Sequence, residues 1–241
     1  MVSGAPDVLG PICGTPRRLS GVLPAGTVPP GEASLRLVTV EGKPHVGPVA
    51  VGIETIGNAG QMLLRVRLDR STPPGRHRAE LLVGDETRQV ILDVEPSTLL
   101  RVEPPSLSLH GAPGATLTTS LLIINRGNVD VAIPAHAIVG VYNEEGIETA
   151  VARAYGADAD DGLEILKTFI MELRAGYGGL LKLDIEEGVG PILPGGAQNL
   201  RLRTTLPAKL MARRAYSGFW AIENLRYLIS VSVTKGDSNV R

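Results

Sequence analysis

The chain has 241 residues, and 24 Lys and Arg against 25 Asp and Glu leave a formal net charge of −1. This balance excludes a generically basic nucleic-acid binder, and the single cysteine, Cys13, excludes an internal disulfide framework and a cysteine-rich zinc site. A hydrophobic content of 43% suffices for a core, so the composition predicts one large folded domain or two small ones. No apolar run is long enough to span a membrane.

Short runs of alternating apolar and polar residues dominate the chain, with Gly- and Pro-rich turns between them. Apolar residues alternate along 62–68, 79–83 and 90–94, and the sequence GDET forms the turn between the last two runs. Turn signals every 8–12 residues between such runs are typical of antiparallel β-sandwiches. We therefore predict an all-β fold.

The same pattern returns later in the chain, along 200–206, 218–222 and 229–233. Near the start of each copy, PPGEASLRLVTVEG aligns with GAPGATLTTSLLIINRG. Self-similarity of this kind indicates tandem copies of one module. The proline-containing sequence EPSTLLRVEPP marks the predicted boundary between two sandwiches.

These patterns divide the chain as follows. We expect a loose Pro/Gly-rich leader and first strand at 1–30 and a first sandwich core at 31–98. A second sandwich at 99–236 carries an insert at 143–190, and a polar tail follows at 237–241.

The insert contains the only convincing helix of the sequence. Its apolar residues fall at helical spacing, Asp160 or Asp161 can cap its start, and Gly176 can end it. An apolar stripe of this kind is more often core packing than a binding face, and we expect it against the open side of the second sandwich. If part of it is exposed, it is the candidate protein-binding site, formed by Leu166, Phe169, Ile170, Leu173 and Tyr177.

Aromatic residues and charges are unevenly distributed. The first of the eight aromatic residues is Tyr142, which excludes base or sugar stacking by the first module. Residues 143–190 carry eleven acids and four bases, a net of −7, whereas 191–241 carry eight bases and two acids, a net of +6. Either these segments pair within one domain, which we favour, or each contacts a separate partner.

Catalytic and metal-binding motifs are absent from the sequence. The four histidines are His45, His77, His110 and His136, and they stand apart without metal-ligand spacing. No nucleophile elbow or phosphate-binding loop is present. The acidic run at 158–164 departs from calcium-loop spacing, so we interpret it as a helix N-terminus, with calcium as the alternative. We expect a protein that is not an enzyme and needs no cofactor or metal.

One turn carries a resemblance to known families. The strand ending in N-R-G-N at 125–128, followed by an alternating run and Pro, resembles bacterial Ig-like modules and sandwiches of the ASPM–SPD-2–Hydin and major-sperm-protein type. The closing sequences PPGRHRAELLVGDETRQVILDVEP and YSGFWAIENLRYLISVSV resemble the last hairpin of such modules. The resemblance implies two tandem immunoglobulin-like β-sandwiches, the second with a helix-containing insert, and a binding or scaffolding role.

The expected function is therefore a non-enzymatic interaction or scaffold protein that docks another protein through the helical insert or a sheet edge. The alternative is a periplasmic chaperone acting by strand addition, since the length also resembles the two-sandwich pilus chaperones. That resemblance implies a basic clamp formed by Arg17 or Arg18 with Arg101. A carbohydrate-active protein would instead require Trp220 and Tyr227 to be exposed and coplanar, whereas their alternation with Ile229 points them inward.

The expected partner is a protein and not a nucleic acid, and we expect no transmembrane segment in this chain. The N-terminal sequence lacks the pattern of a signal peptide. The localisation is therefore cytoplasmic, or periplasmic or extracellular if a signal peptide was removed. The sequence leaves the oligomeric state open.

Overall fold

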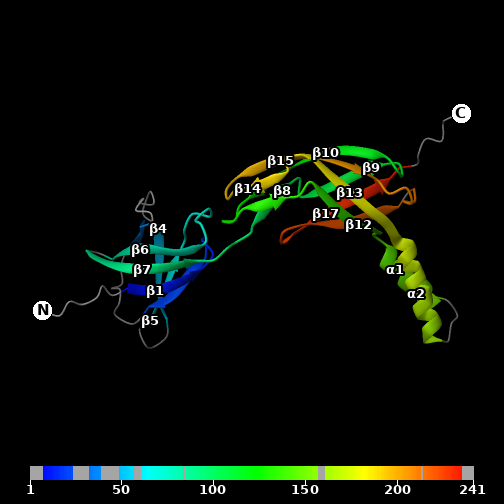
Figure 1. Ribbon diagram of the computed structural model, residues 1–241. Helices are drawn as coiled ribbons and strands as arrows, with labels where there is room; N and C mark the ends of the chain where they lie inside the picture. The colour runs from blue at the N-terminus through cyan, green and yellow to red at the C-terminus, as the bar shows by residue number, and fades with distance from the viewer. Residues whose placement is uncertain are drawn as a thin grey trace. The chain divides into compact units, whose positions relative to one another are not determined.

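The protein is described by a computed structural model that covers residues 8–23, 33–38, 49–56, 61–83, 85–156, 161–212 and 214–234. The chain divides into two compact units (Figure 1). The first runs to Leu99 and also includes the segments Asn125–Asp130 and Leu193–Gly195. The remaining residues from Leu100 onward form the second unit.

The first unit contains seven described strands. They are β1 (Val8–Gly14), β2 (Leu19–Leu23), β3 (Ala33–Val38), β4 (Val49–Ile56), β5 (Gln61–Val66), β6 (Gly75–Val83) and β7 (Glu86–Val94). Their spatial order is β1-β2-β5-β4-β3-β6-β7, and parallel pairing of β1 with β7 closes the ring. This is the order of the seven-stranded immunoglobulin sandwich, in which the first, second, fifth and fourth strands form one layer and the third, sixth and seventh the other.

The second unit repeats this order with additions. Its elements are β8 (Leu100–Glu103), β9 (Ser106–Gly111), β10 (Thr116–Asn125), β11 (Val131–Ile133), β12 (His136–Asn143), α1 (Gly146–Gly156), α2 (Gly162–Gly176), β13 (Tyr177–Glu187), β14 (Gly190–Ile192), β15 (Ala197–Thr205), β16 (Ala215–Ile222) and β17 (Leu225–Val233). The sheet order is β8-β10-β15-β13-β12-β16-β17-β9. Because β8 and β9 together take the place of β1, the order matches that of the first unit. The prediction of two tandem immunoglobulin-like sandwiches with a helical insert is confirmed.

Strand order also identifies equivalent strands in the two units. β15, β16 and β17 occupy the places of β5, β6 and β7, as the alternating runs predict. The alignment of PPGEAS with GAPGAT is wrong, because β3 is the third strand of its unit, whereas β10 corresponds to β2. Two regular strands, β1 and β2, lie within the segment 8–23 that the sequence assigned largely to a loose leader. Residues 1–7 and the tail 237–241 lie outside the described part.

Each unit has its own hydrophobic core. In the first, inward-facing residues of β1, β2, β5, β6 and β7 form one cluster that includes Ile12, Leu64 and Leu92. In the second, residues from both layers of strands form a cluster that includes Ile123, Leu202 and Ile229. The second cluster contains no residue of α1 or α2, and all of its members lie on strands except Leu206 and Leu210, which follow β15.

The aromatic residues of β16 and β17 belong to the second core. Trp220 and Tyr227 are 3% and 2% exposed, and their rings meet edge to face with centroids 6.5 Å apart. The phenol of Tyr227 donates a hydrogen bond of 3.0 Å to the carbonyl oxygen of Pro104. The inward orientation predicted from alternation is confirmed, and the exposed platform needed for sugar stacking is absent at these two residues.

The N-R-G-N turn is held by its own side chains and by the first unit. The buried Asn128 side chain donates hydrogen bonds to the carbonyls of Thr72 and Glu95, each 3.0 Å, and accepts one of 2.6 Å from the amide of Ser97. Asn125 accepts a hydrogen bond from the amide of Gly127. No residue of this described turn has a positive φ. Glycine is required at 127 because a Cβ there would collide with the carbonyl oxygen of Ser97.

We expect Asn128→Ala to lower the free energy of unfolding of the first unit by about 2 kcal/mol, because it removes three hydrogen bonds to backbone groups, one of them buried and two half-buried. Denaturant unfolding monitored by circular dichroism measures this. The control Asp130→Ala changes an exposed side chain of the same turn and should stay within about 0.5 kcal/mol. Equal effects of the two substitutions would contradict this account of the turn.

Burial raises the pKa of Tyr227 from its usual value of 10.0 to about 12. Below about pH 10 the phenol keeps its proton in both the folded and the unfolded chain. Between about pH 10 and 12 the unfolded chain loses that proton first, so the stability contributed by neutral Tyr227 declines through this window.

We therefore expect Tyr227→Phe to cost about 1 kcal/mol at neutral pH, and the difference from wild type to shrink as the pH rises to about 12. Unfolding in denaturant at a series of pH values measures both effects. Tyr155→Phe, at a residue 75% exposed, is the matched control. A difference that stays constant with pH would contradict the assigned burial effect.

Candidate functional site: an apolar groove at the base of a helical hairpin

Two helices interrupt the second sandwich between β12 and β13, where the sequence predicted one. α2 begins and ends where expected, with Asp161 as the N-cap accepting a 3.0 Å hydrogen bond from the Leu163 amide. α1 was missed because its inward positions are Gly146, Ala150 and Ala154, which give only a weak apolar pattern. Together α1 and α2 form what we call the hairpin, which projects from the sheet (Figure 1).

The two helices of the hairpin pack on each other through small residues. Gly146, Ala150 and Ala154 recur every four residues along the buried side of α1. A Cβ on Gly146 would lie 3.7 Å from the Cα of Gly176, so the two ends of the hairpin meet at its base. Arg153 of α1 holds Glu172 of α2 through two hydrogen bonds of 2.9 and 2.8 Å. The hairpin is therefore built by contacts within itself.

Most large apolar side chains of the hairpin are exposed. They recur at helical spacing along each helix. On α1 the side chains of Ile147, Val151 and Tyr155 are 67, 41 and 75% exposed. On α2 those of Leu163, Leu166 and Ile170 are 56, 51 and 48% exposed. Met171 is 62% exposed. The expectation that the α2 stripe lies against the open side of the sandwich is wrong for these residues, since the strands already fill the core.

A groove of about 550 Å³ lies where the hairpin joins the sheet. Ile147 and Leu173 line it from the helices, and Tyr142 and Phe219 line it from β12 and β16. Gly140 also lines the groove, and the ring of Tyr142 lies over it, 3.4 Å from where a Cβ of residue 140 would stand. The groove is therefore a mainly apolar hollow with aromatic walls, and Asn143, Glu144 and Ser217 add polar groups to its lining.

The sheet surface beside the groove is also apolar. Leu180 pairs with Gly140 across β13 and β12, and Phe219 pairs with Leu228 across β16 and β17. Leu180 and Phe219 are 59% and 56% exposed, and Ile138, on the same face of β12, is 67% exposed. Exposed apolar surface that continues from a groove onto a sheet is typical of interaction sites.

Cations lie over the aromatic rings at this face. Tyr142 and Tyr177 contact each other with centroids 5.2 Å apart, and the ammonium of Lys209 lies 4.3 Å from the Tyr177 centroid. The guanidinium of Arg226 lies 5.9 Å from the Phe219 centroid. Positive charge therefore borders the aromatic part of the site.

The predicted binding residues are only partly brought together. Leu173 lines the groove, and Tyr177 stacks on Tyr142 beside it. Leu166 and Ile170 lie exposed along the hairpin, and Phe169 is half-buried. Sequence reasoning missed Phe219, although its place one residue before the inward-facing Trp220 could have indicated an outward side chain. That these residues bind a protein remains a prediction.

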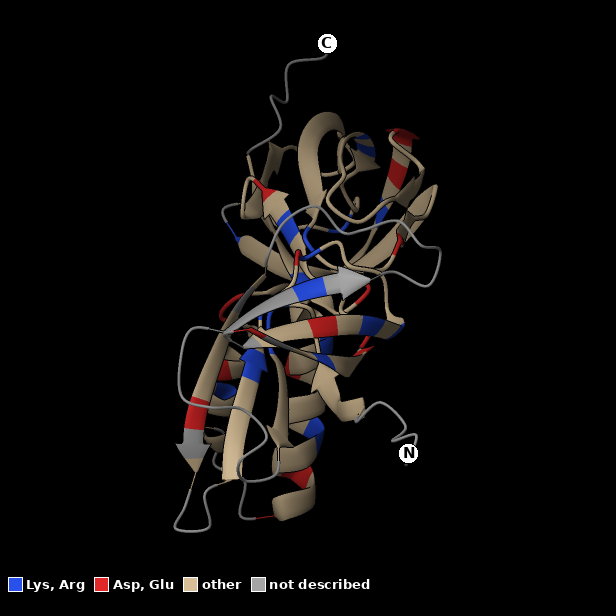
Figure 2. Ribbon diagram, turned by 90° about the vertical axis from the view of Figure 1, so that its left-hand side faces the viewer, with Lys and Arg blue, Asp and Glu red and all other residues tan. Residues whose placement is uncertain are grey.

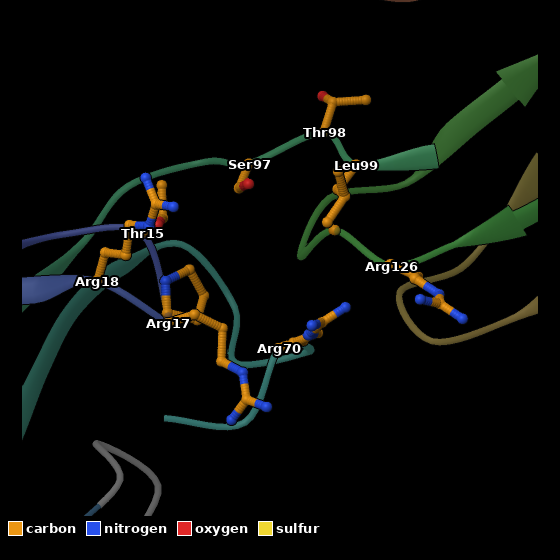
Figure 3. Close-up of a pocket in the computed structure, with 10 residues that line it drawn as sticks. Thr15, Arg17, Arg18, Arg70, Ser97, Thr98, Leu99 and Arg126 are labelled. Atoms are coloured by element: carbon orange, nitrogen blue, oxygen red, sulfur yellow. The ribbon is translucent and has the colours of Figure 1, made fainter. Parts of the chain in front are cut away.

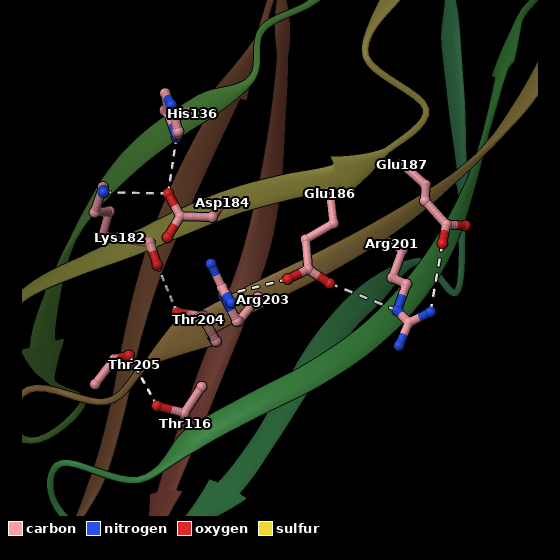
Figure 4. Close-up of polar contacts among 10 residues, drawn as sticks. All are labelled: Thr116, His136, Lys182, Asp184, Glu186, Glu187, Arg201, Arg203, Thr204 and Thr205. Carbon is pink, nitrogen blue, oxygen red and sulfur yellow. Dashed lines mark hydrogen bonds and ion pairs between the residues drawn. The ribbon is translucent and has the colours of Figure 1, made fainter.

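A cluster of polar side chains occupies another part of the second sheet (Figure 4). Asp184 contacts His136 Nδ1 at 2.8 Å and Lys182 Nζ at 3.2 Å. Both hydrogen bonds lower the pKa of Asp184, and the one from His136 has the larger effect. Glu186 forms ion pairs with Arg203 and Arg201 at 3.3 and 3.6 Å.

Acids of the 143–190 segment thus pair with bases of the 191–241 segment between the neighbouring strands β13 and β15. The hairpin acid Glu172 instead pairs with Arg153 of the hairpin. Figure 2 shows charges of both signs along the strands.

The other candidate residues occupy separate places. His77 is half-buried, with Nε2 2.8 Å from the carbonyl oxygen of Pro73. Among the described residues, no three His, Cys, Asp or Glu side chains gather as a metal site would require. His45, Asp158 and Asp160 lie outside the described part. No described helix is long and apolar enough to cross a membrane.

The features expected of a strand-addition chaperone fit the structure poorly. Arg101 pairs with Glu103 at 2.7 Å in the second unit, whereas Arg17 and Arg18 belong to the first. The apolar residues of β8, Leu100 and Val102, are buried rather than exposed. The described strands of the first unit form a closed ring, which leaves no free edge for an added strand.

Comparison with known proteins gives structural likenesses of low similarity. No protein-family model and no curated protein matches the sequence. Among solved structures, a protein of unknown function from Porphyromonas gingivalis W83 is similar at 12% identity and a TM-score of 0.28, over 92% of this chain and 96% of that one. A titin fragment is similar at 9% identity and a TM-score of 0.28, over 93% of this chain and 95% of that one. Bovine butyrophilin is similar at 11% identity and a TM-score of 0.29, over 94% of this chain and 96% of that one. The assignment of the fold therefore rests on strand order.

We expect the hairpin to be removable without loss of the second unit. Deleting 147–175 joins Gly146 to Gly176, whose backbones already meet, and removes no residue of the strand core. Far-ultraviolet circular dichroism should lose its helical component and keep its strand component, with cooperative thermal unfolding retained. Loss of the cooperative transition would show that the hairpin is part of the fold.

Proposed function

We propose that the protein is a non-enzymatic interaction module that docks an amphipathic helix of a partner protein in the groove at the base of the hairpin. The observation that carries the proposal is the exposed apolar surface formed by Ile147, Tyr142 and Phe219 beside the half-buried Leu173, outside a core that is complete without it.

The shape and periodicity of this surface favour a helix as the occupant. The apolar stripes of α1 and α2 repeat every three or four residues, which is the spacing that a third helix matches when it packs alongside two others. An extended strand would need a free sheet edge, whereas the groove lies on the outward face of β12 and β16. A helix with one apolar side therefore fits best.

Charge favours acidic residues beside that apolar stripe. Lys209 and Arg226 border the aromatic part of the site, and neither forms an ion pair among the described residues. Acidic side chains on the partner helix would neutralise them and leave the cation–π contacts in place. The partner is thus a protein with an acidic, amphipathic helix.

A photoreactive amino acid at position 219 tests the proposal in lysate of the native organism. The crosslinked protein is identified by mass spectrometry, purified, and titrated against the intact chain. Phe219→Asp and Ile147→Asp should each weaken binding by more than about tenfold, because each places a charge in an apolar contact.

The matched control is Val189→Asp, at a residue of the second unit that is 47% exposed and lies away from the groove residues. It should leave binding unchanged. Unchanged affinity in Phe219→Asp and Ile147→Asp would overturn the proposal, as would a crosslink only to a second copy of this chain.

A further inference from the structure

Four arginines line a pocket of about 380 Å³ whose lining residues all belong to the first unit (Figure 3). Arg17 and Arg18 come from the turn between β1 and β2, and Arg70 follows β5. Arg126 comes from the N-R-G-N turn. Residues far apart in the sequence thus bring four positive charges to one cavity.

No acidic residue in the described part of the chain pairs with this cluster. None of the residues that line the pocket is acidic. Within the described part of the chain, none of the four guanidinium groups forms an ion pair or a side-chain hydrogen bond. Four like charges around one cavity repel one another, and an anion bound among them would remove that repulsion.

The backbone that carries the arginines is fixed by short hydrogen bonds. The Arg18 amide donates to the Thr15 carbonyl at 2.8 Å, and the Leu68 amide donates to the Pro16 carbonyl at 2.7 Å. The Arg126 amide donates to the Leu99 carbonyl at 2.7 Å. The arginines therefore start from a preorganised frame, which lowers the entropy lost when a ligand orders their side chains.

We propose that this pocket binds a ligand through a phosphate monoester group, which carries close to two negative charges at neutral pH. All four bases are arginine, whose planar guanidinium donates paired hydrogen bonds to tetrahedral oxyanions. A single carboxylate would leave most of this positive charge unmatched, whereas a dianion with three terminal oxygens can engage several guanidinium groups. The hydroxyls of Thr15 and Ser97 line the same pocket and supply neutral donors.

Isothermal titration of the full chain at low salt tests this site with inorganic phosphate, pyrophosphate, sulfate and acetate as probes. We expect pyrophosphate to bind at least about tenfold more tightly than acetate, with affinity that falls as salt rises.

Arg17→Gln and Arg70→Gln should each weaken pyrophosphate binding by about tenfold, since each removes charge-assisted hydrogen bonds. Arg67→Gln removes the same charge from an exposed residue outside the pocket and should leave the affinity unchanged. Thermal unfolding of each variant without ligand checks that the fold is intact.

Two results would overturn the proposal: acetate binding as tightly as pyrophosphate, or all three substitutions having equal effects. Because the pocket shares no residue with the groove, failure here leaves the proposed docking of a partner helix untouched.

Discussion

Inward-facing side chains of the two strand layers pack against each other in the second unit, and this contact encloses the core without help from either helix. Ile123, Leu202 and Ile229 are fully buried among residues of strands. Burial of such side chains is the main favourable contribution to folding, at about 25 cal/mol per Å² of apolar surface. The other features of the unit, including the hairpin and the outward sheet face, follow from what this packing leaves exposed.

The hairpin illustrates the consequence most clearly. Its helices contact each other through Gly146, Ala150 and Ala154, so their larger apolar residues have no place in the interior. Side chains such as Ile147 and Leu166 then remain in water, where each costs free energy that the sandwich does not recover. A partner that covers them would recover it, which is the physical basis of the proposed docking site.

The first unit places its charged surface in a comparable way. Asn128 and Gly127 fix the N-R-G-N turn through contacts that only these residue types allow, and Arg126 lies beside them in the same turn. The turn therefore has a buried part, which holds the backbone, and the half-buried Arg126, which contributes charge to the arginine pocket.

The sequence predicted much of this fold because alternation reports directly which side of a strand is buried. Trp220 and Tyr227 point inward as predicted, and α2 begins at the expected cap, Asp161. α1 was not predicted, since small residues on its buried side produce no apolar stripe. The groove and the arginine pocket were not predicted either, because they join residues whose proximity depends on strand order, which alternation does not specify.

Hydrogen exchange of the native protein, followed residue by residue, tests most directly whether the strands hold the second unit together and the hairpin stands outside that core. The account predicts that amides of α1 and α2 exchange through local opening, with protection far below that of β12, β15 and β16. Equal protection of helices and strands, lost together in denaturant, would contradict it.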